Sequence, residues 1–225
     1  MLLLRLVLWY NPERKEREEW NMGYLFSILL GYVLGSSSMA YYIGKLKRQD
    51  VRKAGTGNLG ASNTAVLFGW TAAVLVAVHD IAKAAIAVLA AKLLFGDLAY
   101  AGAAAGAAAV IGHIFPFYLG FRGGKGLASY FGMTLALDWK LAVIVAVVLV
   151  AVTVVTDFIS LAAITTVILV PAYVWLVLHN PAMALVVAAA SAVMLYKHRE
   201  NIVRIARGEE IGLRSTAKGE NRIDK

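Results

Sequence analysis

Six long apolar stretches constrain the fold of this chain more than any other feature of its sequence. A helix needs about 20 residues to cross the roughly 30 Å hydrocarbon core of a bilayer, and most of these stretches approach that length. A seventh stretch, 127–137, is shorter and crosses only if its helix begins inside the preceding glycine motif or the bilayer is locally thinned. The six long stretches are 24–44, 68–94, 98–121, 141–156, 158–178 and 182–196.

The composition indicates that these stretches are helices in lipid. Hydrophobic residues make up 60% of the chain and charged residues only 16%, whereas a soluble domain is about 45–50% apolar. The stretches are rich in Ala, Leu and Val and lack the alternation of a membrane barrel, so helices satisfy their backbone polar groups best. We therefore predict an all-α fold, a polytopic membrane helix bundle of about seven transmembrane helices. The absence of cysteine excludes disulfides and thiol chemistry.

One membrane-embedded domain is predicted over residues 22–210. Residues 1–21 hold an apolar run too short to span and no small-residue cleavage site, so we expect an interfacial or unstructured N-terminal extension and not a signal peptide. Residues 211–225 are predicted to be a polar C-terminal tail. In so apolar a chain, the net charge of +8 indicates orientation in a lipid bilayer and argues against nucleic acid as a partner. The sequence leaves the oligomeric state open.

Three polar segments, which we call the first, second and third islands, interrupt the apolar sequence at 45–63, 120–126 and 197–225. With seven crossings they follow the first, third and seventh spans, so all three lie on one side of the membrane. They carry most of the Lys and Arg residues, whereas the loops of the opposite side hold little more than Lys92 and Lys140. The positive-inside rule therefore predicts a multi-pass protein of the cell membrane whose island face is cytoplasmic.

The first island contains the sequence DVRKAGTGNLGASN at 50–63. Its glycines permit close approach of the backbone to a ligand, and its neutral polar side chains supply hydrogen bonds, so the segment is suited to anion binding. The alternative interpretation is a polar turn with a helix cap at Asn63. The basic pair at 52–53 favours phosphate. The predicted binding residues are Arg52, Thr56, Gly57, Asn58 and Asn63.

The second island reads GFRGGKG at 120–126 and stands immediately before an apolar stretch. Glycine amides, the positive end of a helix and two cations make a cradle for an anion. The motif is not a Walker loop, because only three residues separate Gly120 from Gly124 and glycine replaces the Ser or Thr that binds Mg²⁺. A basic turn beside the membrane is the alternative. The predicted binding residues are Arg122, Gly123, Gly124 and Gly126, with Lys125 at the centre.

The remaining polar residues are less specific. His198 and Asn201 are three apart in the third island and share a helical face, although a snorkelling basic helix end has the same appearance. Asp80 and Lys83, midway along a span, are expected to form an ion pair that supports the bundle and a polar cavity. The other histidines lack a metal-ligand pattern, so neither a metal nor a cofactor is predicted. GxSxG and HxxxxD motifs are also absent.

Taken together, the motifs resemble those of a known family. They are GS at 35–36 with AY at 40–41, DVR at 50–52, GTGNLGASN at 55–63, HIFPF at 113–117, FRGGKGLAS at 121–129 and KHREN at 197–201. In this order and spacing the chain is similar to the bacterial acyl-phosphate-dependent glycerol-3-phosphate acyltransferase family, the PlsY type. The resemblance runs from about residue 22 to about residue 210.

The resemblance implies a seven-helix enzyme that transfers a fatty acyl group from acyl phosphate to the 1-hydroxyl of glycerol 3-phosphate, giving lysophosphatidic acid and phosphate. It implies no cofactor. Carried onto this sequence, the catalytic residues are Lys125, His198 and Asn201, and Ser129 joins the phosphate-binding set. No residue is an obvious nucleophile, which is consistent with direct attack by the glycerol hydroxyl on the acyl phosphate; the resemblance then implies catalysis by positioning and charge stabilisation. A substrate phosphate accepts the proton or, alternatively, His198 acts as the general base.

One position departs from the family pattern. The family commonly has an arginine, a ligand of glycerol phosphate, where this chain has Val66. Losing a charged donor to phosphate costs about 1.5–3 kcal/mol unless another cation replaces it, and Arg52 or Lys53 is the candidate replacement. Two alternatives follow from the sequence: a paralogous acyl-phosphate acyltransferase with another acceptor, or a transporter of small anions.

Overall fold

The structure, a computed structural model, describes residues 12–217, and within that range every regular element is helical. The prediction of an all-α fold is confirmed. The expected N-terminal extension lies outside the described residues up to residue 11. The elements are α2 (Pro12–Ser36), α3 (Met39–Leu46), η1 (Val51–Lys53), α4 (Ala61–Phe68), α5 (Trp70–Leu94), α6 (Ala101–Ile114), η2 (Phe117–Leu119), α7 (Leu127–Leu137), α8 (Trp139–Thr156), α9 (Ile159–Leu176), α10 (Pro181–Lys197), α11 (Arg199–Arg207) and α12 (Leu213–Ala217).

The described helices account for about seven membrane crossings. Five segments are long and apolar enough to span: Met22–Leu46, Trp70–Leu94, Ala101–Leu119, Trp139–Thr156 and Ile159–Leu176. The pair of α10 and α11 makes a sixth, but a bend of 50° separates the two helices, so the last helix does not continue straight into the third island as the sequence suggests. The short α7, with 11 residues, completes the set.

The bundle is apolar outside, and small residues form the contact between α2 and α6. Large side chains such as Leu93 and Val155 are 85% and 81% exposed, as expected of surfaces that face lipid. Gly31 and Gly35 of α2 lie directly against the backbone of Ala105 and Ala109 in α6, where a β-carbon would overlap the carbonyl groups. Small residues therefore let the helix backbones approach closely.

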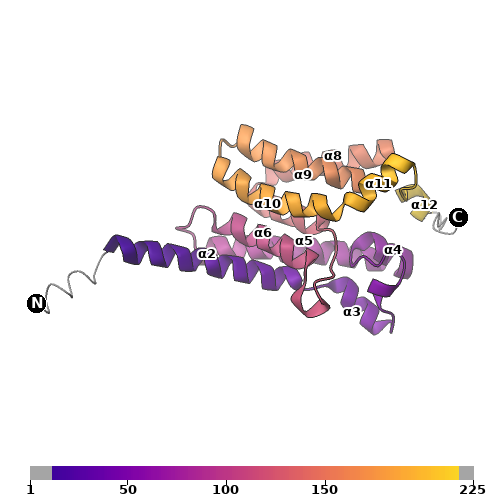
Figure 1. The fold of residues 1–225 in the computed structure, drawn as a ribbon, viewed down its shortest axis with the longest axis horizontal. Helices are drawn as coiled ribbons and strands as arrows, with labels where there is room; N and C mark the ends of the chain where they lie inside the picture. Colours follow the sequence, from indigo (N-terminus) through magenta and orange to yellow (C-terminus); the bar gives the residue numbers. More distant parts are fainter. Residues whose placement is uncertain (1–11, 218–225) are drawn as a thin grey trace, which may run out of the picture.

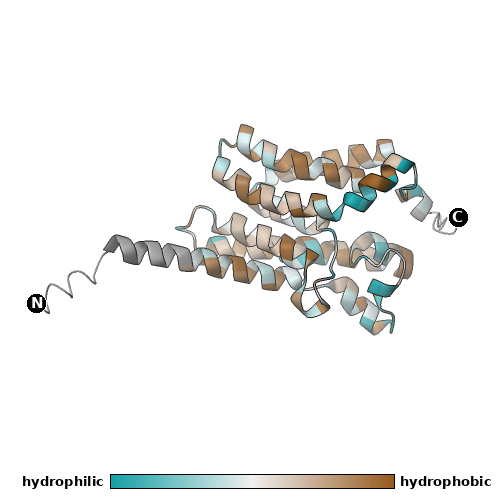
Figure 2. Cartoon of the chain, viewed as in Figure 1, coloured by the Kyte–Doolittle hydropathy of each residue, from teal (hydrophilic) through white to brown (hydrophobic). Residues whose placement is uncertain are grey.

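The helices form two groups, which are linked by α7 and by a direct contact between α10 and α6. In Figure 1, α8, α9 and α10 pack together on one side, and α2, α5 and α6 on the other. Helix α7 contacts α5, α6 and α8, and so links the groups. Figure 2 shows that hydrophilic residues of α11 and of the segment around η1 lie at the same end of the bundle.

Helix α7 ends at the far side of the bundle in spite of its shortness. Lys92, near the end of α5, donates a 2.7 Å hydrogen bond to the carbonyl of Ala136, near the end of α7. At about 1.5 Å per residue, 11 residues cover only about 16 Å. The glycine loop that precedes α7 must therefore lie below the membrane surface on the island side.

Candidate functional site

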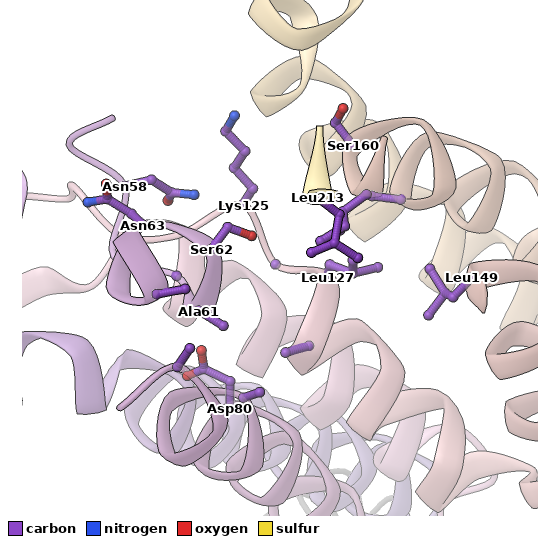
Figure 3. Close-up of a pocket in the computed structure, with 18 of the residues that line it drawn as sticks. Asn58, Ala61, Ser62, Asn63, Asp80, Lys125, Leu127, Leu149, Ser160 and Leu213 are labelled. Atoms are coloured by element: carbon purple, nitrogen blue, oxygen red, sulfur yellow. The ribbon is translucent and has the colours of Figure 1, made fainter. Parts of the chain in front are cut away.

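A cavity of about 570 Å³ opens where the three islands meet. It lies between α4, α5, α7, α8 and α9, and the segment after α11 closes one side. Figure 3 shows Lys125 between the side chains of Asn63 and Ser160. The islands thus share one side of the bundle, as their order along the chain predicts. Predicted site residues that line the cavity are Thr56, Asn58, Asn63, Lys125, Gly126, His198 and Asn201.

The glycine loop of the second island folds back on the end of α6. The amide of Gly123 donates to the carbonyl of Ile114, and the amide of Gly124 to that of His113, both at 3.1 Å. Gly126 then forms the N-cap of α7 with φ +97°, a left-handed conformation that favours glycine. This geometry places the first residues of α7 at the cavity wall, where the positive end of a helix attracts anions.

Lys125 is the cation that the loop places in the cavity. Its Nζ donates to Oδ1 of Asn201 in the third island. Within the described chain no carboxylate lies at ion-pair distance from it, so a neutral amide is its side-chain partner. Burial, and secondarily the charge of Arg204, lowers the pKa of Lys125 below its ordinary value of 10.5. The ammonium group is therefore held in place while its charge stays available to a ligand.

Glu210 anchors Asn201 from behind. Its Oε1 accepts hydrogen bonds from Nδ2 of Asn201 and from Oγ of Ser160, both at 2.6 Å. Its Oε2 accepts from Nε of Arg204 at 2.8 Å. Since the amide of Asn201 donates to Glu210, its oxygen must face Lys125. The buried carboxylate thus fixes both the amide and a second cation at the cavity wall.

His198 lies at the break between α10 and α11 and is buried. Its Nδ1 is 2.8 Å from the carbonyl of Met194. A carbonyl only accepts, so Nδ1 carries the proton and Nε2 of the neutral ring has a free lone pair. His198 lines the cavity and is therefore arranged to accept a proton there.

The first island is braced by Asn63. Its Oδ1 accepts from the amide of Thr56 at 2.9 Å, and its Nδ2 donates to the carbonyls of Val51 and Ala54 at 3.3 and 3.2 Å. Asn63 lies inside α4, whose N-cap is Gly60, so the alternative of a cap at Asn63 is wrong. The bracing presents Thr56 and its neighbours to the cavity.

Several predicted residues do not line the cavity: Arg52, Gly57, Arg122, Gly123, Gly124 and Ser129. The guanidinium of Arg52 is bonded to Asp50 at 3.0 Å and to the carbonyl of Leu119 at 3.3 Å. Arg122 is exposed, and the Oγ of Ser129 is buried without a hydrogen-bond partner in the described chain. Val66 does line the cavity, and neither Arg52 nor Lys53 replaces the missing arginine there.

The sequence reasoning missed Glu210, Arg204 and Ser160. In the sequence Glu210 is an acidic residue at the end of a basic segment. Nothing in the spacing indicates that the chain returns to α9 after the break between α10 and α11. The predicted C-terminal tail also contributes to the site, since Ile211 and Leu213 line the cavity. Leu213 is held by a 2.8 Å bond from its amide to the carbonyl of Asp157, at the turn between α8 and α9.

The inner half of the cavity is apolar. Beyond the polar groups it continues along side chains of α5, α7, α8 and α9. A cavity of this kind fits an amphiphilic ligand, with an anionic group at the basic mouth and a hydrocarbon part below it. Among the apolar lining residues are Val74, Ile81, Leu127, Phe131, Leu149 and Val150.

A buried ionic cluster borders the cavity on the side of α5 and α6. Lys83 donates to Asp80 at 2.7 Å, to the carbonyl of Ser37 at 2.6 Å and to Nδ1 of His113 at 3.0 Å. The predicted ion pair is therefore present, and Asp80 and His113 line the cavity. Asp80 is ten residues after Trp70, about 15 Å into α5. The glycine loop, which packs on His113, is recessed to a similar depth.

Comparison with known proteins agrees with this architecture. The family model described as glycerol-3-phosphate acyltransferase matches residues 25–208. The glycerol-3-phosphate acyltransferase of Shouchella clausii is 38% identical over 190 residues, covering 82% of this chain and 93% of the relative. That of Rhodospirillum rubrum is 40% identical over 189 residues, covering 81% and 87%.

Two solved structures are also similar. The crystal structure of PlsY, an integral membrane glycerol 3-phosphate acyltransferase, in its glycerol 3-phosphate form has a TM-score of 0.81 and 33% identity, covering 87% of this chain and 98% of that one. The lysophosphatidic acid form has a TM-score of 0.77 and 32% identity, covering 84% and 94%. The similarity thus extends over the whole membrane bundle.

Proposed function

The chain belongs to the glycerol-3-phosphate acyltransferase family, and from this premise we propose that its acyl donor is an acyl phosphate. As an acyltransferase of the membrane it acylates glycerol 3-phosphate to lysophosphatidic acid. An acyl phosphate has a dianionic head on a long hydrocarbon chain. The observation that supports this donor is the recessed glycine loop, which joins a basic mouth to an apolar inner cavity.

The proposed reaction needs no enzyme-bound intermediate. The oxygen of the 1-hydroxyl of glycerol 3-phosphate attacks the acyl carbonyl carbon, the new C–O bond forms, and the bond to the phosphate oxygen breaks with release of phosphate. The hydroxyl proton passes to Nε2 of His198, whose lone pair is free. The alternative recipient is the phosphate of a substrate.

We assign the remaining roles by charge and position. Lys125, oriented by Asn201, neutralises phosphate charge, and the first amides of α7 assist it. Arg204 is the second cation at the cavity wall and is the candidate to compensate for Val66. Thr56 and Asn58 supply neutral hydrogen bonds to phosphate oxygens.

We further propose that the cavity opens to the cytoplasm and that the protein is in the cytoplasmic membrane. The islands that surround the cavity mouth carry most of the Lys and Arg residues of the chain. Such residues are enriched in cytoplasmic loops. This orientation gives a water-soluble phosphate ester access to the site.

The proposal is tested with purified protein in detergent or vesicles. We expect lysophosphatidic acid from palmitoyl phosphate and glycerol 3-phosphate, and none from palmitoyl-CoA. Lys125→Ala is expected to lower kcat by about 10²–10³-fold or more, because it removes a charged group that faces the reaction. The control is Lys140→Ala, at an exposed lysine at the start of α8.

The same assay includes other hydroxylated acceptors, among them glycerol and sn-glycerol 1-phosphate. We expect glycerol 3-phosphate to be the best of them. Equal activity with palmitoyl-CoA would refute the proposed donor, and full activity of Lys125→Ala would refute the role of Lys125.

A further inference from the structure

His113 presents an unused polar atom to the cavity. The residue is 7% exposed and lies in the last turn of α6. Its Nδ1 contacts the buried ionic cluster, whereas its Nε2 has no hydrogen-bond partner among the described residues. His113 lines the cavity. An unpaired polar atom of a buried side chain at a cavity wall indicates a ligand contact.

Lys83 determines which nitrogen of His113 carries the proton. Its Nζ is 3.0 Å from Nδ1, and an ammonium group only donates. The contact of the same Nδ1 with Asp80 is longer, 3.4 Å, and Asp80 is closer to Lys83 than to His113. In the neutral ring Nδ1 is therefore the acceptor, and Nε2 carries a hydrogen that it can donate.

The Nε2 edge of the ring packs against the glycine loop. A β-carbon on Gly124 would overlap Nε2, so the loop approaches the ring as closely as its backbone allows. The next residue is Lys125, and Gly126 is the N-cap of α7. Nε2 therefore borders the cavity one residue away from Lys125, next to the predicted phosphate position, where the acyl group attached to that phosphate would come within its reach.

We propose that His113 is a further catalytic residue, whose Nε2–H donates a hydrogen bond to the carbonyl oxygen of the acyl donor. This inference rests on the proposed acyl phosphate. During attack the carbonyl electron pair moves onto that oxygen, and it returns when phosphate leaves. His113 keeps its proton throughout and stabilises the transient negative charge. Lys83 is the positioning residue that fixes the required tautomer.

Two substitutions separate this role from a structural one. The amide nitrogen of glutamine can occupy the place of Nε2, and asparagine places an amide only near Nδ1. We expect His113→Asn to lower kcat by about 10²–10³-fold with little change in the KM for palmitoyl phosphate. His113→Gln should remain within about tenfold of the parent. The proposal would be overturned if His113→Asn had a kcat equal to or above that of the parent. Equal losses of kcat in His113→Asn and His113→Gln would also overturn it.

A second measurement observes the tautomer in the parent protein itself. In the parent protein with ¹⁵N-labelled histidine, the nitrogen shifts of His113 should report a protonated Nε2 and an unprotonated Nδ1. The His113→Gln spectrum, which lacks this signal, assigns it among the four histidines. A protonated Nδ1 would overturn the tautomer. If the parent is active with acyl phosphate and only these results fail, the proposed function stands. If the parent is inactive, the proposed function itself fails.

Discussion

Two lysines of the same bundle have opposite surroundings. Lys83, in the middle of α5, has three partners for its three donors, including the carboxylate of Asp80. Among the described residues, Lys125 in the glycine loop has one side-chain partner, the neutral amide of Asn201. The carboxylate nearest to that partner, Glu210, is occupied by Asn201, Ser160 and Arg204. A saturated cation stabilises the protein, and an unsaturated one is available to bind a substrate.

The comparison is tested most strongly by removing each charge. Lys83→Met leaves Asp80 buried without its closest partner and is expected to lower the free energy of unfolding by about 3–5 kcal/mol. Lys125→Met removes a cation that has no carboxylate partner, so stability should change by less than about 1 kcal/mol while activity is lost. Thermal unfolding in detergent measures the first effect and the acyl-phosphate assay the second.

The double variant Asp80→Asn/Lys83→Met is the control for the first lysine. If the loss comes from an unpaired buried charge, the double variant should recover part of the stability of Lys83→Met. No recovery would mean that Lys83 acts through packing or through His113 alone.

A smaller effect is expected at Glu210, which orients Asn201 and Arg204. Glu210→Gln removes the charge and should raise the KM for glycerol 3-phosphate by about 10- to 100-fold, the equivalent of a lost charged hydrogen bond. Ser160→Ala removes one neutral hydrogen bond from the same carboxylate and should cost about fivefold. Equal effects of the two substitutions would contradict a role for the carboxylate charge.

The smallest effect is on the alkaline side of the pH profile. The pKa of Lys125 is lowered by burial and by Arg204. Its charged form is present below this pKa and is lost as the pH rises through it, so activity should begin to fall below the pH at which an ordinary lysine, with a pKa of 10.5, loses its proton. Lys125→Arg keeps its charge in this range. Its activity, although lower at neutral pH, should stay constant where that of the parent declines, and parallel profiles would disprove the assignment.

The sequence predicted those parts of the fold that depend on local pattern. Apolar length predicted helices close to α5, α8 and α9, and parity with charge placed the three islands on one side. The breaks at Ser37 and His198 were not predicted, because both lie in segments whose composition allows a continuous helix.

The site was predicted only where its residues are contiguous in sequence. The motifs indicated Lys125, Asn201 and Asn58, all of which line the cavity. They could not separate Asn63, which braces its loop, from a ligand-binding residue, because both uses need the same side chain. Glu210 and His113 depend on contacts between segments far apart in the chain. Such contacts can be identified only from the three-dimensional structure.

The depth of the glycine loop has a consequence for how the reaction rate depends on its substrates. Because α7 is short, the loop lies deep in the bundle, and the acyl phosphate that we propose as donor could react there without leaving the bilayer. The water-soluble acceptor must instead enter the recessed site from the aqueous phase. The effective concentration of one substrate is thus its mole fraction among the surrounding lipids, and that of the other its concentration in water. Diluting the membrane with inert lipid should therefore slow binding of the donor and leave binding of the acceptor unchanged.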